Sequence, residues 1–207
     1  MLRLAAISAS VAVVALLGVT AYVTMTAGSD DPFEQCRTGA VAGGATIGGP
    51  FTLVNSLGET VTDADVITEP SLIYFGYTFC PDICPFDSAR NSEAVDLLAE
   101  RGISTTPVFI TIDPERDTPE IVGEFAYNNH EKMIGLTGSP EQIKAASQAY
   151  RTYYKAQPAE DEYYLVDHST FTYLVMPETG FAEFFRREMT PEQMAESVAC
   201  FAKAATK

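Results

Sequence analysis

Two cysteines four residues apart, between an apolar run and a helix-like run, constrain this chain more than any other feature. Residues 72–77 form the apolar run, Cys80 and Cys84 follow it, and residues 89–101 are helix-like. Thiols at a helix start lie one turn apart on the same face. The positive end of the helix dipole should lower their pKa and favour the thiolate. The pair can therefore form a disulfide or bind one soft metal ion.

The order of apolar and capping patterns predicts an α/β fold. The expected strands, which begin with a hairpin, are residues 51–54, 60–61, 71–77, 107–112, 163–166, 171–176 and 181–185. Capping patterns that contain Pro and Glu predict helix starts at residues 117–120, 139–142 and 190–193, and the second helix should run to about Tyr153. Alternating strands and helices indicate a central mixed sheet with helices on both faces. A dithiol at a strand–helix junction is typical of thioredoxin-like folds.

The N-terminal residues predict a membrane anchor. Residues 4–27 contain no charge, and this run of 24 residues exceeds the length of about 20 that crosses a bilayer. Arg3 precedes the run and Asp30 follows it, so the positive-inside rule places the N-terminus in the cytoplasm. A cleaved signal peptide is the alternative. Its apolar region would be about 7–15 residues long, and residues 24–27 make a poor cleavage site.

We therefore expect a single-pass protein of the bacterial inner membrane, with its domain facing the periplasm. Residues 1–3 would be a short cytoplasmic end, residues 4–27 the transmembrane helix, residues 28–50 a Gly-rich linker and residues 51–207 the folded domain. The net charge of −15 lies almost wholly beyond the anchor. So acidic a domain argues against nucleic acid as a partner. It would suit a basic or metal-carrying partner, although a solubility coat explains most of the carboxylates.

Cys36 and Cys200 lie near the two ends of the predicted domain. An extracytoplasmic compartment permits disulfides. A bond between these cysteines would close a long loop, for which the chain-entropy estimate is at most about 5 kcal/mol. Two buried free thiols are the alternative, and we favour the disulfide.

His168 completes a candidate metal site. It lies between two strand-like segments, in a loop that can approach the helix start carrying Cys80 and Cys84. Two thiolates and an imidazole suit Cu(I) better than Mg²⁺ or Ca²⁺. They would also suit Zn²⁺, although structural zinc sites usually have four ligands. The alternative for His168 is a histidine that is only hydrogen-bonded locally. The alternative for the two cysteines is a redox or structural disulfide.

Other polar residues are weaker candidates. Asp82 would offer an oxygen to Cu(II), tune the pKa of the thiols or, as is commoner at such positions, help to cap the helix. Asp167 would orient the ring of His168 as a hydrogen-bond acceptor, or be a solvated loop carboxylate. His130 follows a helix-like segment and is expected to cap it without binding metal.

Three segments of the chain resemble the signature of the Sco/SenC family. In order, they are residues 74–85 (YFGYTFCPDICP), 109–119 (FITIDPERDTP) and 164–169 (YLVDHS). The resemblance covers roughly residues 51–200, and the predicted anchor fits it. It implies a thioredoxin-like fold and copper binding by Cys80, Cys84 and His168. It also implies a role in building the dinuclear copper centre of cytochrome c oxidase subunit II.

The sequence thus favours a membrane-tethered copper chaperone that delivers copper to cytochrome c oxidase subunit II. With reduced thiols, Cys80, Cys84 and His168 would hold Cu(I), and a Cu(II) state would add another ligand. A disulfide between the two cysteines would abolish tight binding. The alternative is a thiol–disulfide oxidoreductase that reduces the cysteines of the oxidase subunit without an obligatory metal. Further partners would be other periplasmic copper chaperones or thioredoxin-like reductants. A peroxide-scavenging role lacks a dedicated motif.

Overall fold

The computed structural model describes residues 15, 17–20, 22, 32–37, 47–159 and 163–206. The chain divides into two units, Met1–Gln35 and Cys36–Lys207. In the first unit residues 17–20 are helical, and the Thr20 hydroxyl donates to the Leu17 carbonyl at 3.0 Å. Most of the predicted anchor lies outside the described residues. Among those that are described, no helix has the length and apolar character needed to cross a membrane.

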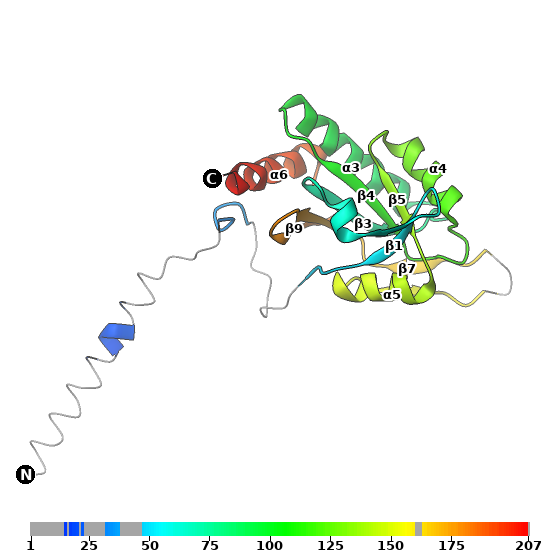
Figure 1. Ribbon diagram of the computed structural model, residues 1–207, viewed down its shortest axis with the longest axis horizontal. Helices are drawn as coiled ribbons and strands as arrows, with labels where there is room; N and C mark the ends of the chain where they lie inside the picture. The colour runs from blue at the N-terminus through cyan, green and yellow to red at the C-terminus, as the bar shows by residue number, and fades with distance from the viewer. Residues whose placement is uncertain are drawn as a thin grey trace, which may run out of the picture. The chain divides into compact units, whose positions relative to one another are not determined.

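A seven-stranded mixed sheet organises the second unit (Figure 1). The strand order is β2-β1-β5-β4-β3-β8-β9. The strands are β1 (Thr52–Asn55), β2 (Thr60–Thr62), β3 (Ser71–Gly76), β4 (Thr106–Thr111), β5 (Ile134–Thr137), β8 (Thr172–Met176) and β9 (Gly180–Phe185). β3, β4 and β5 are parallel, and the strands on either side of them pair antiparallel. The predicted mixed sheet is confirmed.

Helices cover both faces of this sheet. They are α2 (Asp63–Val66), α3 (Ile83–Glu100), α4 (Pro119–Asn129), α5 (Pro140–Ala149) and α6 (Pro191–Ala205). α3 and α4 connect successive parallel strands, and right-handed crossovers in one direction place both helices on the same face. α6 packs beside α3, whereas α5 contacts β1 and lies on the opposite face (Figure 1).

The centre of the sheet forms the core. Every residue of β3 and β4 is buried, as expected of strands that are covered on both faces. Phe75 of β3 packs against Tyr150 and Tyr173, with ring centroids 5.4 and 6.0 Å away. These aromatic contacts on one side of β3 hold the strand in place. The loop that carries Cys80 follows directly after the strand.

Side-chain caps start three of the helices as predicted. The side chains of Thr118, Ser139 and Thr190 each accept a hydrogen bond from the backbone N–H three residues later. Pro follows each cap, where its missing N–H removes no helical hydrogen bond. The predicted positions of these helix starts are therefore confirmed.

The prediction that the second of these helices continues to Tyr153 was wrong. Arg151 takes a left-handed φ of 52°. The N–H of Thr152 donates to the carbonyl of Ser147 at 3.0 Å, which closes a Schellman motif at the end of α5. Gly usually occupies the left-handed position, so Arg151 gives no stop signal in the sequence.

A two-stranded ribbon stands apart from the large sheet. β6 (Tyr154–Ala156) pairs antiparallel with β7 (Val166–His168). The sequence predicted a strand over residues 163–166, but of these only Val166 is in a strand, and β6 was not predicted. Strands of three residues are too short for apolar alternation to reveal them. His168 therefore ends a strand and does not lie in a loop.

Cys36 and Cys200 form a disulfide, as predicted. Cys200 lies in α6, so the bond fastens residue 36 to the last helix. The guanidinium of Arg37 also donates to the Ala182 carbonyl at 2.7 Å. These contacts hold the start of the second unit against its C-terminal elements. The predicted linker and domain boundaries remain predictions.

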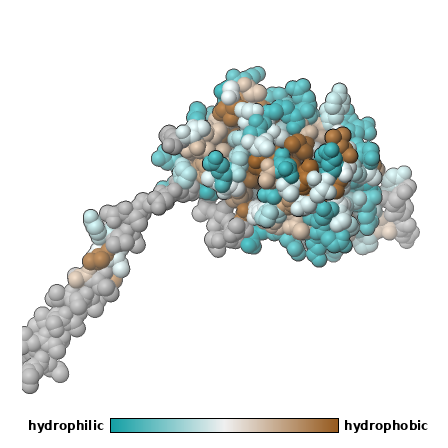
Figure 2. Space-filling view, in the orientation of Figure 1, coloured by the Kyte–Doolittle hydropathy of each residue, from teal (hydrophilic) through white to brown (hydrophobic). Residues whose placement is uncertain are grey.

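The surface of the second unit agrees with its acidic composition. In the view of Figure 2, hydrophilic residues cover most of the coloured surface of this unit, with smaller hydrophobic groups between them. Several carboxylates at helix starts, such as those of Glu120, Glu141 and Glu192, are fully exposed. These carboxylates are therefore solvated.

Removing the Cys36–Cys200 disulfide should destabilise the protein. The bond joins residues 164 positions apart, and loss of a native disulfide typically costs about 2–5 kcal/mol. We expect Cys200→Ser to lower the free energy of unfolding of the full chain by this amount, as measured by urea denaturation. Cys36→Ser should have the same effect, and the double variant should be no less stable than either. An unchanged free energy of unfolding would contradict the assignment.

Candidate metal centre

Cys80, Cys84 and His168 converge on one point. Their two sulfur atoms and one ring nitrogen all lie within 4.8 Å of one another. Cys84 Sγ lies 3.5 Å from His168 Nε2. The loop after β3 supplies Cys80, the first turn of α3 supplies Cys84, and the end of β7 supplies His168. The fold thus gathers three soft or borderline donors from separate elements.

Cys80 precedes α3 instead of lying on it. The N–H of Cys84 points at Cys80 Sγ at 3.4 Å, so this sulfur satisfies one of the N–H groups that a helix start leaves without a partner. Asp82 occupies the N-cap position, but its side chain makes no capping hydrogen bond. The expectation that Asp82 caps the helix was therefore wrong, because the sulfur of Cys80 takes that place.

The two thiols differ strongly in acidity. A hydrogen bond from the Cys84 thiol is the largest of the causes that lower the pKa of Cys80 to about 4, and the N–H groups of Cys84 and Asp82 act in the same direction. Donating that hydrogen bond raises the pKa of Cys84, and its complete burial raises it further. The lowered pKa that was expected of both thiols is found for Cys80 only, and its largest cause is the hydrogen bond from Cys84. The pair is thus one thiolate beside one protonated thiol.

The ring of His168 is held with Nε2 toward the sulfurs. Its Nδ1 lies 2.9 Å from the backbone carbonyl of Ser169. A carbonyl only accepts, so we assign the proton to Nδ1, which leaves the lone pair of Nε2 facing Cys84. The rings of Tyr74 and Tyr77 meet the imidazole edge-on, with centroids 6.2 and 5.8 Å away. The imidazole is therefore oriented by a backbone carbonyl and two aromatic neighbours.

The other polar candidates lie outside this cluster. Asp167 is exposed and accepts a hydrogen bond from the Gln157 side chain at 2.8 Å, so it does not orient the ring of His168. His130 occupies the C-cap position of α4, as predicted, and its ring lies 3.2 Å from a carboxylate oxygen of Asp96.

Gly76 makes room for the buried sulfur. A Cβ at this position would lie 3.0 Å from Cys84 Sγ, 2.8 Å from the ring of Tyr74 and 3.0 Å from that of Phe109. Such contacts are too close for any larger residue without displacement of the neighbours. The requirement for glycine at the end of β3 is thus steric. The sequence analysis gave Gly76 no role, although it lies within the first segment that resembles the family signature.

Asp117 fastens the cysteine loop to the neighbouring strand. Its buried carboxylate accepts hydrogen bonds from the backbone N–H of Thr78 at 3.0 Å and from the hydroxyls of Thr78 and Thr111. Burial raises the pKa of this carboxyl group, against the effect of those hydrogen bonds. The sequence analysis placed Asp117 only at a helix start. Its position in the second resembling segment was the one available signal.

Arg116 connects the same loop to the chain before β7. Its guanidinium carbon lies 3.6 Å from the ring centroid of Tyr164 and 5.0 Å from that of Phe79. The Tyr164 hydroxyl donates to Asp113 at 2.6 Å, and Asp113 also pairs with Arg116. These contacts tie the cysteine loop, the segment after β4 and the segment before β7 to one another.

The fold and the cluster together define a class of protein. A thioredoxin-like sheet carries two thiols after a central strand and an imidazole opposite them, which is an arrangement for soft-metal or thiol redox chemistry. A model of the SCO1/SenC family matches residues 39–203. The chain belongs to this family.

The relatives support this assignment. Protein SenC of Rhodobacter capsulatus is 55% identical over 199 residues, which are 96% of this chain and 90% of SenC. The mitochondrial SCO1 homolog 1 of Arabidopsis thaliana is 43% identical over 163 residues, which are 78% of this chain and 49% of that protein. The crystal structure of Arabidopsis thaliana ScoI with copper bound has a TM-score of 0.72 and 42% identity, and covers 76% of this chain and 99% of its own.

The metal-free reduced protein should keep the Cys80 thiolate at low pH. The pKa of Cys80 is about 4, whereas a free cysteine has about 8.5, so the thiolate should be lost only as the pH falls through about 4. Cys84→Ala removes the donated hydrogen bond and should raise this pKa. Cys84→Ser keeps a hydroxyl donor and should raise it less. Ultraviolet thiolate absorbance against pH measures these transitions, and a parent transition near 8.5 would contradict the arrangement.

Proposed function

We propose that this protein is a membrane-anchored copper metallochaperone that delivers copper to the dinuclear copper site of cytochrome c oxidase subunit II. The observation that carries the proposal is the approach of Cys80, Cys84 and His168 to within 4.8 Å. The copper-bound state of the solved Arabidopsis relative supports copper as the metal. The copper ion is cargo in this proposal, taken up from one partner and released to another.

The donor set fits a cuprous ion. Thiolates and an imidazole suit Cu(I), whereas carboxylate and water ligands suit Mg²⁺ or Ca²⁺. Among the described residues the cluster has three members, which is one fewer than a structural zinc site usually has. Three donors leave a side of the ion open, through which a ligand of the partner can enter. A Cu(II) state would take a further ligand there.

The unequal thiols suit reversible loading. The thiolate of Cys80 is ready to bind at neutral pH, whereas Cys84 must release its proton to become a ligand. The lone pair of Nε2 on His168 already faces the sulfurs. Copper would then leave by stepwise exchange, in which each donor of this chain is replaced by one of the acceptor. The predicted anchor, residues 4–27, would hold this exchange at the periplasmic face of the bacterial inner membrane.

A thiol–disulfide oxidoreductase that acts on the cysteines of the oxidase subunit is the second candidate. The specific observation in its favour is the thiolate of Cys80 next to the protonated thiol of Cys84, since the thiolate is the attacking species in disulfide exchange. The solved BsSco structure, which has 25% identity and a TM-score of 0.60, covers 77% of this chain and 94% of its own. It is described as having a disulfide switch, in a family of cytochrome c oxidase assembly proteins.

Replacing His168 should separate the two functions. We expect His168→Ala to weaken Cu(I) binding by the full chain at least about 10-fold, because even groups that only support a metal ligand commonly contribute that much. His130→Ala, which removes the chain's other histidine outside the cluster, should leave binding unchanged. Competition with a Cu(I) chelator measures both affinities.

Disulfide reduction gives the complementary result. A reductase should retain its rate in His168→Ala and lose it in Cys80→Ser, as followed by thiol release from an oxidised peptide of the oxidase subunit. Unchanged Cu(I) affinity and stoichiometry in both His168→Ala and Cys84→Ser would overturn the copper proposal.

A further inference from the structure

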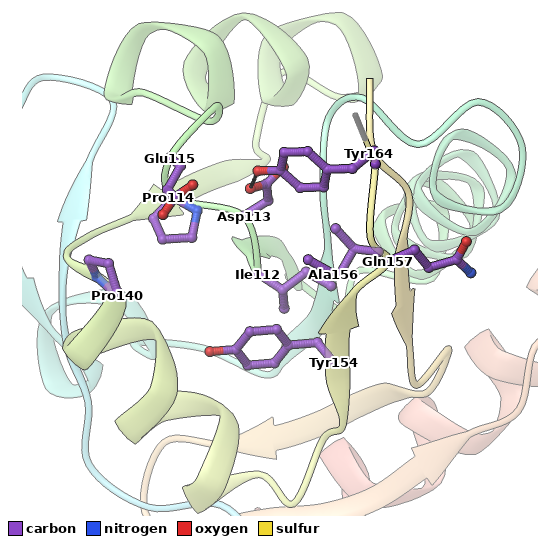
Figure 3. Close-up of a pocket in the computed structure, with 11 residues that line it drawn as sticks. Ile112, Asp113, Pro114, Glu115, Pro140, Tyr154, Ala156, Gln157 and Tyr164 are labelled. Carbon is purple, nitrogen blue, oxygen red and sulfur yellow. Dashed lines mark hydrogen bonds between the residues drawn. The ribbon is translucent and has the colours of Figure 1, made fainter. Parts of the chain in front are cut away.

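A pocket of about 360 Å³ lies beside the metal centre and takes no part in it. In Figure 3, Pro114 and Pro140 face Tyr154 and Ala156 across this pocket, with Ile112 between them. Val166 of β7 also lines it. The volume is at the lower end of ligand pockets, so the space suits one or two side chains of a bound segment.

The pocket adjoins an unpaired strand edge. Two backbone hydrogen bonds flank the ribbon. The N–H of Gln157 donates to the Leu165 carbonyl at 2.8 Å, and the N–H of Ser169 donates to the Tyr153 carbonyl at 2.9 Å. They show which residue pairs of β6 and β7 are the hydrogen-bonded ones. Because hydrogen-bonded and non-hydrogen-bonded pairs alternate in antiparallel strands, the N–H and carbonyl groups of Ala156 point away from β7.

The same holds for the backbone groups of Tyr154, which stands two residues before Ala156. Among the described residues, no backbone hydrogen bond engages this outer edge of β6. It is therefore open to a further strand.

The pocket and the metal centre share one face of the ribbon. Tyr154 pairs with His168, and Ala156 pairs with Val166. Side chains two residues apart on a strand, and those directly opposite on its partner, point to the same face. Tyr154 and Val166 line the pocket, so the side chain of His168 continues the same row. A segment bound along β6 would therefore run toward the metal ligands.

Among the described residues that line the pocket, one carboxylate has no salt-bridge partner. Asp113 lines the pocket, but its carboxylate is engaged by Tyr164 and Arg116. Glu115 also lines the pocket and is exposed, and among the described residues it forms no salt bridge. An incoming lysine or arginine would meet Glu115 beside the apolar part of the lining, which Ile112, Ala156 and Val166 form.

We infer that this pocket docks an extended, basic segment of the protein that exchanges copper with this chain. The segment adds a strand to the open edge of β6, places an apolar side chain between Ile112 and Val166, and sets a basic residue beside Glu115. This inference rests on the proposed copper exchange and specifies its docking site. Docking at the face of the ribbon that carries His168 brings the partner's ligands to the open side of the metal site.

A labelled peptide tests the inference. The probe has alternating valine and lysine over about nine residues, which span ~30 Å when extended, and its affinity for the full chain is followed by fluorescence anisotropy. Ala156→Pro removes the N–H that faces the open edge, a position where proline is tolerated, and should weaken binding at least about 10-fold, the effect of ~1.4 kcal/mol. Ala156→Val adds a side chain of similar volume at the pocket but keeps the N–H, so it should bind the peptide more tightly than Ala156→Pro does.

Reversing the charge of Glu115 gives an independent test of the docking site. Glu115→Lys should weaken binding of the valine–lysine peptide and favour a valine–glutamate peptide, whereas the matched control Glu178→Lys, at an exposed turn, should change neither. Equal binding by Ala156→Pro and Ala156→Val, or no binding by the parent, would overturn the inference. So would self-association of the chain that Ala156→Pro abolishes, because a second copy would then be the occupant.

Copper affinity separates this result from the proposed function. None of Ala156, Glu115 and Glu178 belongs to the Cys80, Cys84 and His168 cluster, so Cu(I) binding should be unchanged in all four variants. If Cu(I) binds normally and the peptide does not, the docking site is wrong and the copper proposal stands. If the parent chain fails to bind Cu(I), the proposed function is wrong, whatever the peptide does.

Discussion

The buried sulfur of Cys84, seated against Gly76 at the end of β3, is the contact on which the rest of the site depends. β3 is covered on both faces and held by its aromatic neighbours, so its last residue is a fixed point. Since Gly76 has no side chain, the first turn of α3 can bring Cys84 directly over the strand end. From there its N–H and thiol both reach Cys80. The position of one sulfur thus sets the charge of the other.

Hydrogen bonds from neighbouring elements hold the rest of the site around this contact. Asp117 binds the cysteine loop to the strand beside it, and Ser169 holds the ring of His168 through a backbone carbonyl. Both interactions use buried or half-buried polar groups, which stabilise only when they are paired. These contacts therefore restrict how far the donor atoms can move, and such preorganisation lowers the ordering cost of binding an ion. A preformed site with an open side is well suited to accept and release the same ion.

Much of this arrangement was predictable from the sequence, for physical reasons. The buried strands, the mixed sheet and three helix starts follow from apolar runs and from capping residues before Pro, which act locally. The pairing of Cys36 with Cys200 was predicted from the expected extracytoplasmic compartment and from their places near the two ends of the domain. The approach of His168 to Cys80 and Cys84 was expected from the order of segments and from a family resemblance, because no local pattern links residues so far apart.

Other features depend on tertiary contacts that the sequence does not display. The ribbon that carries His168 has strands of three residues, and Arg151 ends α5 in a conformation that usually belongs to glycine. The difference in acidity between Cys80 and Cys84 arises because one thiol is buried more deeply and donates to the other. A rule based on the helix dipole predicts the same shift for both thiols, so it does not predict this difference in pKa.

X-ray absorption spectroscopy of the full chain loaded with one equivalent of Cu(I) tests the central claim most directly. We expect a copper ion bound by two sulfur atoms and one imidazole nitrogen, and His168→Ala should remove the nitrogen while both sulfurs remain. A spectrum with one sulfur, or with nitrogen and oxygen ligands only, would contradict the claim that these three side chains hold a single ion.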